Sequence, residues 1–303
     1  MKHPKDELER LVEIVAGEVY RRLENQAKCP ESGCDLPDCK AKNGNCAECE
    51  GCVSKKPVTV QRMVNEGAVR FSSAQGQQPP THGQLAAMID HTLLKPDVSH
   101  EQIKKLCDEA LKYKFATVCV NSSNVGLAAQ LLSGSAVKPI AVVGFPLGAS
   151  TPRAKAFETL EALRAGAQEI DMVINIGALK SKDYQTVFTD IRGVIEAAGS
   201  MPVKVILETS SLDTDEKIIG SALSKAAGAA FVKTSTGFGG GGATVEDIKL
   251  MRRIVGNDIG VKASGGVRTF EDAQKFIEAG ANRLGASASV EIVTGQKSEA
   301  KGY

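Results

Sequence analysis

The chain has 303 residues, of which 42% are hydrophobic and 24% are charged, and its formal net charge is +1. Such a chain can bury the core of one large domain and still carry an appendage. A nearly neutral balance argues against nucleic-acid binding, and no apolar run reaches the roughly 18 residues that cross a bilayer. Charged residues crowd the first ten positions, where a signal peptide would become apolar. We therefore expect a protein that works in the cytoplasm, without nucleic-acid or membrane partners.

Residues 5–24 have apolar side chains at steps of three and four positions, from Leu8 to Leu23. This period predicts one amphipathic helix. A lone helix of this kind needs a surface on which to bury its apolar face. The candidates for that surface are its own domain, a sister subunit and a separate partner.

Residues 29–80 begin with a cysteine-rich segment and end as a linker. Two successive Cys-x-x-Cys steps, in a protein expected inside the cell, favour a non-catalytic metal site over disulfides, with zinc ahead of an iron–sulfur cluster. The alternative is a tether with free or redox-active thiols. The chain then runs through polar and turn residues to Pro79-Pro80, which predicts domains at 1–28, 29–80 and 81–303. The cysteines concerned are Cys29, Cys34, Cys39, Cys46, Cys49 and Cys52.

After residue 80, short β-rich runs alternate with helical segments about eight times. This order predicts an α/β domain folded as a closed (β/α)8 TIM barrel. The alternative, an open doubly wound sheet, usually has a Gly-x-Gly-x-x-Gly turn after its first strand, and Asp90 to Leu94 offers none. The predicted strands are 88–92, 116–120, 140–143, 169–176, 203–208, 231–234, 260–264 and 283–286. The predicted helices include 99–112, 151–165, 183–198, 213–227, 244–255 and 269–279.

Polar residues gather where these strands end, which is the end of a barrel that carries the active site. Lys233 follows the apolar pair Phe231 and Val232, and a lysine there is costly unless it is paired, neutral or chemically used. Taken alone, it would be interpreted as a lysine that reaches out to solvent. A second lysine on the next strand and an aspartate on the fourth favour a catalytic role. The strand-end set is Asp90, Thr92, Cys119, Asn121, Asp171, Glu208, Lys233, Thr236 and Lys262.

Glycine- and serine-rich turns follow the last two strands, at 264–268 and 285–289, and a short helix is expected to start near Ala288. Backbone N–H groups in such turns suit a phosphate group. A further glycine-rich loop, Gly237 to Gly242, follows the sixth strand. The three segments together predict a phosphate site on this side of the barrel.

Several of these stretches resemble the deoxyribose-phosphate aldolases, a family of class I aldolases with a (β/α)8 barrel. The resemblance covers residues 84 to about 292 and does not extend to residues 1–80. The stretches that carry it are Asp90-His-Thr-Leu-Leu94, Gly144-Phe-Pro-Leu-Gly148, Glu169 to Leu179, Lys204 to Thr209, Phe231-Val-Lys-Thr-Ser-Thr-Gly-Phe238 and Val261-Lys-Ala-Ser-Gly-Gly-Val-Arg268.

The resemblance implies reversible cleavage of 2-deoxyribose 5-phosphate to glyceraldehyde 3-phosphate and acetaldehyde, without a cofactor. It implies that Lys233 forms the Schiff base, that Lys262 is the second lysine and that Asp171 assists proton transfer. It also implies a homo-oligomer. Two departures stand out: Phe238 replaces a lysine of some relatives, and Tyr303 ends a tail whose length differs from theirs. The implied substrate residues are Asp90, Thr92, Cys119 and Thr236, and the implied phosphate residues are Gly237, Gly265, Gly266, Gly285 and Ser287.

The chemistry of a lysine nucleophile agrees with this assignment, because only the neutral amine attacks a carbonyl. A nearby Lys262 would lower the pKa of Lys233. The alternatives are an aldolase for a related phosphorylated aldol, a sugar-phosphate-binding barrel without catalysis, and a scaffold built around the cysteines. The helix expected at residues 5–24 resembles the encapsulation peptides of bacterial microcompartments, which predicts shell proteins as partners; an oligomerisation or redox-regulatory tail is the alternative.

Overall fold

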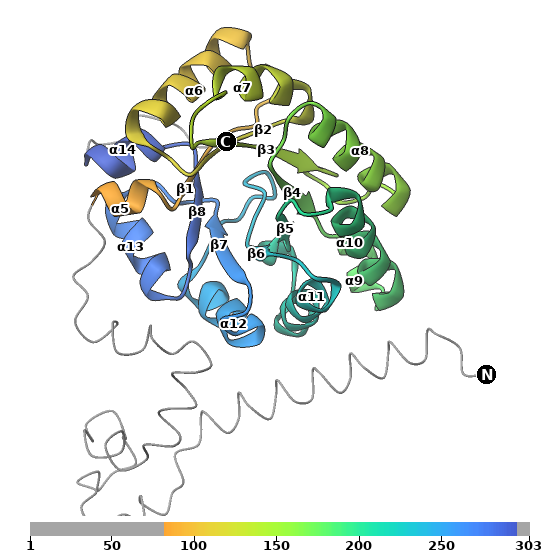
Figure 1. Cartoon of the computed structure of the whole chain (residues 1–303). Helices are drawn as coiled ribbons and strands as arrows, with labels where there is room; N and C mark the ends of the chain where they lie inside the picture. Colours follow the sequence, from red (N-terminus) through yellow and green to blue (C-terminus); the bar gives the residue numbers. More distant parts are fainter. Residues whose placement is uncertain (1–81, 296–303) are drawn as a thin grey trace, which may run out of the picture. The chain divides into compact units, whose positions relative to one another are not determined.

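The computed structural model describes residues 82–295, in which eight parallel strands close into one barrel (Figure 1). Each strand pairs with the next along the chain, and β8 pairs with β1. The predicted (β/α)8 architecture is therefore confirmed. The strands are β1 (Ile89–Leu93), β2 (Thr117–Val120), β3 (Lys138–Val143), β4 (Glu169–Val173), β5 (Val203–Ile206), β6 (Phe231–Lys233), β7 (Gly260–Ser264) and β8 (Arg283–Ala286).

Helices surround the barrel on its outer side (Figure 1), and the six predicted ones are found with ends within about one residue. Capping boxes at Ser99 and Thr269 start two of them, as their sequences predict. The helices are α5 (His82–Ala86), α6 (His100–Tyr113), α7 (Val125–Leu131), α8 (Pro152–Arg164), α9 (Ile176–Lys180), α10 (Tyr184–Ala198), α11 (Thr214–Ala227), α12 (Val245–Val255), α13 (Phe270–Glu278) and α14 (Ser289–Thr294), with 3₁₀ turns η3 (Ser122–Asn124) and η4 (Thr209–Ser211).

Two strands end two or more residues earlier than predicted. Strand β4 stops at Val173 rather than at residue 176, because the side chain of Asn175 accepts a hydrogen bond from Ala178 N and so starts α9. Strand β5 stops at Ile206 rather than at residue 208, and Glu208 has a left-handed backbone with φ of 57°. Apolar content alone cannot separate a strand from the loop that continues it.

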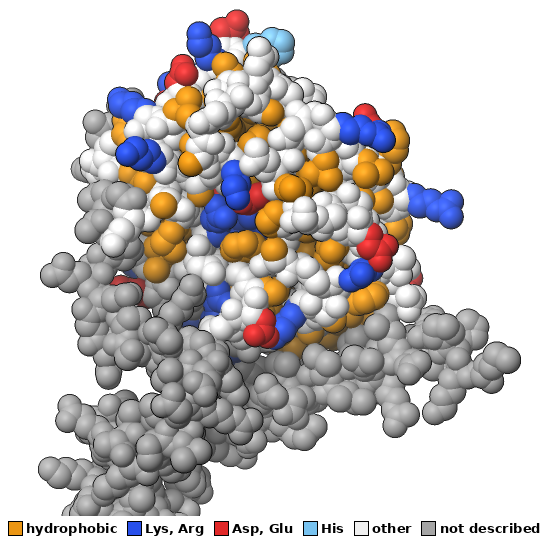
Figure 2. Space-filling view, viewed as in Figure 1, with side chains coloured by type: hydrophobic (Ala, Val, Ile, Leu, Met, Phe, Trp, Pro, Cys, Tyr) orange, Lys and Arg blue, Asp and Glu red, His pale blue; other side chains and the backbone are white. Residues whose placement is uncertain are grey.

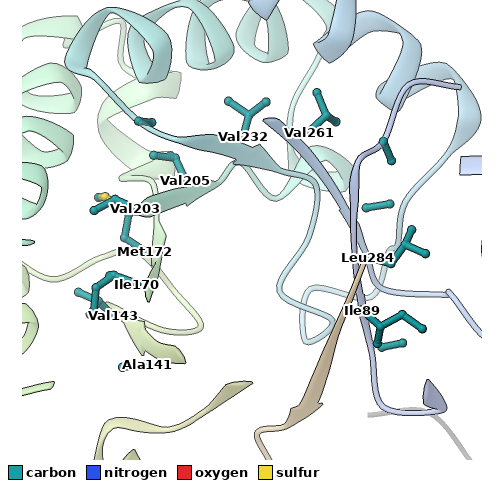
Figure 3. Close-up of a cluster of buried hydrophobic side chains, with 14 of the residues drawn as sticks. Ile89, Ala141, Val143, Ile170, Met172, Val203, Val205, Val232, Val261 and Leu284 are labelled. Atoms are coloured by element: carbon teal, nitrogen blue, oxygen red, sulfur yellow. The ribbon is translucent and has the colours of Figure 1, made fainter. Parts of the chain in front are cut away.

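The outward faces of the strands form the hydrophobic core (Figure 3). Successive side chains of a strand point to opposite faces, so Ile170 and Met172 face the helices while Glu169 and Asp171 face the barrel interior. Each fully buried aliphatic side chain contributes about 1.5–3 kcal/mol to folding. This shell holds the barrel rigid and leaves its interior free for polar residues.

The inward faces carry charge. Viewed along the barrel, basic and acidic side chains lie together at the centre of the ring (Figure 2). The register sets Lys204 beside Asp171, Lys233 beside Lys262, and Lys262 beside Arg283 on neighbouring strands. Strand pairing alone therefore puts these residues at neighbouring positions in the barrel.

The helices found between residues 82 and 295 are all too short or too polar to cross a bilayer. The helix predicted for residues 5–24, the cysteine segment at 29–52 and Tyr303 lie outside the described residues.

Candidate active site

One carboxylate, Asp171 on β4, organises the barrel interior. Its Oδ2 atom accepts hydrogen bonds from Lys233 Nζ at 2.8 Å and from Lys262 Nζ at 2.6 Å. Its Oδ1 atom accepts one from Lys204 Nζ at 3.0 Å. All four side chains are buried. The three residues to which the sequence assigns the chemistry are thus brought together around a single carboxylate.

A second set of charges surrounds this carboxylate. Lys262 Nζ also lies 2.5 Å from Asp90 Oδ2, and Asp90 Oδ1 accepts from Arg283 Nη1 at 3.1 Å. Glu169 is paired with Lys204 and lies 3.4 Å from Arg283 Nη2. A barrel interior filled with ion pairs in this way is stable only if nearly every charge has a partner.

The two central lysines differ in their electrostatic surroundings. Burial lowers the pKa of Lys233, and the positive charge of Lys262 lowers it further, against the opposing effect of Asp171. Burial also disfavours the charged form of Lys262, but Asp171 and Asp90 outweigh that effect and raise the pKa of Lys262. Lys233 is therefore the lysine more readily found as a neutral amine, and Lys262 remains a cation.

The numbers of charges favour the same assignment. The ion-pair network around Asp171 holds three carboxylates (Asp90, Glu169 and Asp171) and four basic side chains (Lys204, Lys233, Lys262 and Arg283). A neutral Lys233 leaves three cations for three carboxylates. Burial opposes ionisation of Asp171, yet its lysine partners hold the pKa of Asp171 well below the usual aspartate range. Asp90 is held low in the same way, by Lys262, Lys204 and Arg283 against burial.

The remaining predicted substrate residues on β1 and β2 lie inside the barrel beside this cluster. The hydroxyl of Thr92 donates to the carbonyl of Asp90 at 2.8 Å. Cys119 packs in a small apolar cluster with Ile140 and Val142, and burial raises the pKa of its thiol to about 11, aided by the charge of Asp171. Cys119 is therefore a neutral part of the wall.

Phe145 extends this apolar wall to the rim. It follows β3, packs against the same apolar cluster and meets Phe238 of the β6–α12 loop edge-to-face, with ring centroids 5.4 Å apart. Phe238 is 41% exposed. The rim between these two loops is thus aromatic.

Thr236 is engaged with its neighbours. Its hydroxyl donates to Glu208 and accepts from Phe238 N at 3.0 Å, and its backbone N–H donates to Glu208 at 3.0 Å. The resemblance implies a substrate contact for Thr236, whereas the structure places its hydroxyl in the anchoring of the loop.

The predicted phosphate residues lie together around a cavity of about 330 Å³. A side chain on Gly285 would crowd Lys262 and Ser264, so this glycine leaves room for the lysine side chain. Arg268 also lines the cavity and supplies a positive charge there. The lining residues include Gly237, Gly265, Gly266, Gly285 and Ser287.

Within residues 82–295, no group of three or more His, Cys, Asp or Glu side chains is arranged to hold a metal ion. The cysteine segment lies outside these residues.

Lys204, Glu169 and Arg283 belong to the charge network but were not among the predicted site residues. These three are the first or second residues of their predicted strands, whereas every residue of the predicted strand-end set comes third or later. Strand alternation held the signal, because Glu169 and Asp171 are two positions apart and share a face.

A closed (β/α)8 barrel with a buried lysine pair around one aspartate is the arrangement of a lysine-dependent, class I aldolase. The family model described as DeoC/LacD family aldolase matches residues 84–295, and the chain belongs to this family. It is thus an aldolase, a carbon–carbon lyase.

Relatives of known name agree with this assignment. The deoxyribose-phosphate aldolase of Clostridium perfringens is 60% identical over 217 residues, which cover 71% of this chain and 97% of that protein. That of Exiguobacterium sibiricum is 62% identical over 216 residues, covering 71% and 98%.

Solved structures show the same fold. A putative deoxyribose-phosphate aldolase from Coccidioides immitis superposes with a TM-score of 0.70 at 43% identity, covering 76% of this chain and 96% of that one. The tetrameric deoxyribose phosphate aldolase from Aeropyrum pernix gives 0.67 at 33% identity, covering 71% and 91%.

Proposed function

We propose that the protein cleaves 2-deoxyribose 5-phosphate reversibly to glyceraldehyde 3-phosphate and acetaldehyde, with Lys233 as the Schiff-base lysine. The observation that carries this proposal is the divergence of the two lysines around Asp171: the pKa of Lys233 is lowered and that of Lys262 is raised. The names of the relatives support the choice of substrate.

The first step joins substrate and enzyme. The neutral Nζ of Lys233 attacks the aldehyde carbon, and the resulting carbinolamine loses water to give a protonated iminium. This step creates a positive charge on a nitrogen that lies 2.8 Å from Asp171 Oδ2. The carboxylate therefore stabilises the charge where it develops.

The second step breaks the C2–C3 bond of the sugar. Loss of the C3 hydroxyl proton releases glyceraldehyde 3-phosphate, and the bonding electron pair moves toward the iminium to give an enamine. Asp171 accepts this proton. Lys262, held between Asp90 and Asp171, donates the proton that the enamine carbon takes up in the next step and regains one from Asp171. Protonation of the enamine carbon and hydrolysis of the iminium then release acetaldehyde and restore Lys233.

The phosphate group occupies the cavity of about 330 Å³ at the β6, β7 and β8 loops, which Arg268 and the glycine-rich turns line. Backbone N–H groups of such turns suit an anion. The electron sink is the iminium itself, so the proposed reaction needs no cofactor. A related phosphorylated aldol would use the same groups and is the competing substrate.

Trapping tests the central assignment. Borohydride reduction in the presence of acetaldehyde should leave an ethyl group on Lys233, identified by peptide mass analysis. An ethyl group on Lys262 alone would reverse the two roles, and a protein without any adduct would contradict the mechanism. Comparing cleavage of 2-deoxyribose 5-phosphate with that of other phosphorylated aldols tests the substrate.

The residues before the aldolase domain have a separate role in this proposal. Residues 5–24 dock on shell proteins and bring a homo-oligomeric enzyme into a microcompartment, where confinement retains acetaldehyde. In support, the C. perfringens relative is matched over 97% of its own length by 217 residues, so the catalytic part needs no such extension. Fusion of residues 1–28 to a fluorescent protein should give co-localisation with shells, and a diffuse signal would contradict the docking role.

The cysteine segment binds a structural metal ion in this proposal, preferably zinc. Two Cys-x-x-Cys steps between Cys46 and Cys52 support it. Metal analysis of the purified full chain should give zinc that is lost when Cys46 and Cys49 are both changed to Ser. Equal metal content in this variant and the natural chain would contradict the assignment.

A further inference from the structure

Glu208 joins the end of β5 to the loop that follows the Schiff-base strand. Its Oε2 atom accepts from the backbone N–H of Thr236 at 3.0 Å and from the Thr236 hydroxyl. That hydroxyl in turn accepts from Phe238 N at 3.0 Å. One buried carboxylate thus holds Thr236 directly and Phe238 through the Thr236 hydroxyl, where the chain passes from Lys233 into the glycine-rich loop 237–242.

The loop packs closely against this carboxylate. A Cβ on Gly239 would lie 2.8 Å from the carboxyl carbon of Glu208, and one on Gly241 would lie 2.3 Å from the Ser210 Cβ. Ser210 donates to Glu208 Oε1 at 3.3 Å. The glycines therefore let the loop lie directly on Glu208 and Ser210, and the position of the loop depends on these two side chains.

The other edge of the loop meets the turn after β7. Ala243 N donates to Gly265 O at 2.9 Å, and a Cβ on Gly242 would lie 2.6 Å from the same oxygen. Gly237, Gly240 and Gly265 all line the cavity assigned to the phosphate. One wall of that cavity is therefore a glycine-rich segment held between Glu208 on one side and Gly265 on the other.

The backbone of Glu208 supports a role that goes beyond packing. Its φ of 57° and ψ of 63° place it in the left-handed region, which is unfavourable for a residue with a side chain. Unfavourable backbone conformations of this kind persist where the surrounding contacts over-determine them, and they are concentrated at functional sites.

We propose that Glu208 is a positioning residue for phosphate specificity: it holds the 237–242 loop so that its backbone N–H groups face the phosphate of the substrate. This inference rests on the proposed function. Glu208 acts through Thr236 and the loop, so it governs the preference for a phosphorylated substrate more than the chemistry at Lys233.

The test compares 2-deoxyribose 5-phosphate with unphosphorylated 2-deoxyribose in full-length variants. Glu208→Ala removes two hydrogen bonds to Thr236 and should raise KM for the phosphorylated substrate roughly tenfold, while kcat/KM for 2-deoxyribose changes less than about twofold. Glu208→Gln keeps an oxygen acceptor of the same shape and should restore the preference to within about threefold of the natural enzyme.

Two more variants make the comparison specific. Glu158→Ala is the matched control, because Glu158 accepts a backbone hydrogen bond at 2.8 Å from Gly144 in the β3–α8 loop, away from the phosphate cavity, and should leave the preference unchanged. Thr236→Val removes only the hydroxyl link and gives a second measurement if Glu208→Ala does not fold. It should reduce the preference in the same direction by a smaller factor.

Suppose that the natural enzyme prefers the phosphorylated substrate. If Glu208→Ala or Thr236→Val then lowers kcat/KM equally for both substrates, or for neither, this inference alone is overturned. A natural enzyme without any preference would instead contradict the phosphate cavity of the proposed function, and the inference with it.

Discussion

Lys155 and Asp190 form a buried ion pair between α8 and α10, with Lys155 Nζ 2.5 Å from Asp190 Oδ2, whereas Lys233 and Lys262 share Asp171 inside the barrel. Both arrangements are shielded from water. In the isolated pair, burial dominates: it lowers the pKa of Lys155 and raises that of Asp190, so each is driven toward its neutral form.

The barrel cluster behaves differently because its carboxylate has several partners. Three lysines hold the pKa of Asp171 well below the usual range despite complete burial. Two carboxylates, Asp171 and Asp90, raise the pKa of Lys262, so it stays charged. Lys233 has only one carboxylate beside it, together with the cation of Lys262, which lowers its pKa. The number and asymmetry of partners, rather than burial alone, therefore decide which lysine becomes a nucleophile.

The largest expected effect comes from breaking the cluster at its nucleophile. Lys233→Met should lower kcat/KM by roughly 10⁴-fold or more, because no other group can form the iminium, and should abolish the borohydride-trapped adduct. Lys155→Met is the matched control, since it removes an equally buried lysine outside the barrel. It should retain the adduct, measured by mass analysis of folded protein. An adduct lost in both variants would contradict the distinction between the two regions.

A smaller effect is expected from removing the cation beside the nucleophile. Lys262→Met should lower kcat by about 100-fold, because a proton donor is lost. The positive charge of Lys262 lowers the pKa of Lys233, so its removal should raise that pKa and shift adduct formation to higher pH. The pH dependence of trapping measures this shift. An unchanged profile would show that burial alone sets the pKa of Lys233.

The smallest effect concerns stability in acid. The pKa of Asp171 is lowered in the folded protein. Its charged form therefore stabilises the fold at pH values above the pKa of an unfolded aspartate, and this stabilisation is lost as the pH falls. Asp171→Asn should accordingly flatten the fall of the unfolding free energy between about pH 5 and 3. The pKa of Asp190 is raised, so Asp190→Asn should steepen that fall. Urea unfolding at several pH values measures both slopes. If both variants change the pH dependence of the unfolding free energy in the same direction, the difference between the barrel cluster and the Lys155–Asp190 pair is contradicted.

The sequence predicted most of this architecture because local signals agreed with the fold. Capping residues such as Ser99 and Thr269 mark helix starts, and eight repeats of strand and helix imply a closed barrel. The short helices α5, α7 and α9 were not among the named predictions; the starts of α7 and α9 are set by local turns rather than by a long apolar period. Strand ends such as that of β5 depend on the backbone of Glu208, which composition does not reveal.

The central residues of the site were predictable from the sequence, but their supporting ions were not. Strand-end position placed Asp171, Lys233 and Lys262 near one another, and the structure adds the distances. The supporting ions at Lys204, Glu169 and Arg283 required the strand register, which fixes the neighbours of each residue across the barrel. The dependence of the 237–242 loop on Glu208 required three-dimensional contacts, because 28 residues of chain separate Glu208 from Gly237.

The edge-to-face pair of Phe145 and Phe238 has a consequence for the evolution of new substrates. The two rings join the loops after β3 and β6 at the rim of the barrel, and neither carries a charge. Substitutions there can change which aldehydes enter without altering the balance of positive and negative charges inside the barrel. Directed evolution toward bulkier acceptors should therefore select changes at these two aromatic positions before any change among the buried ions.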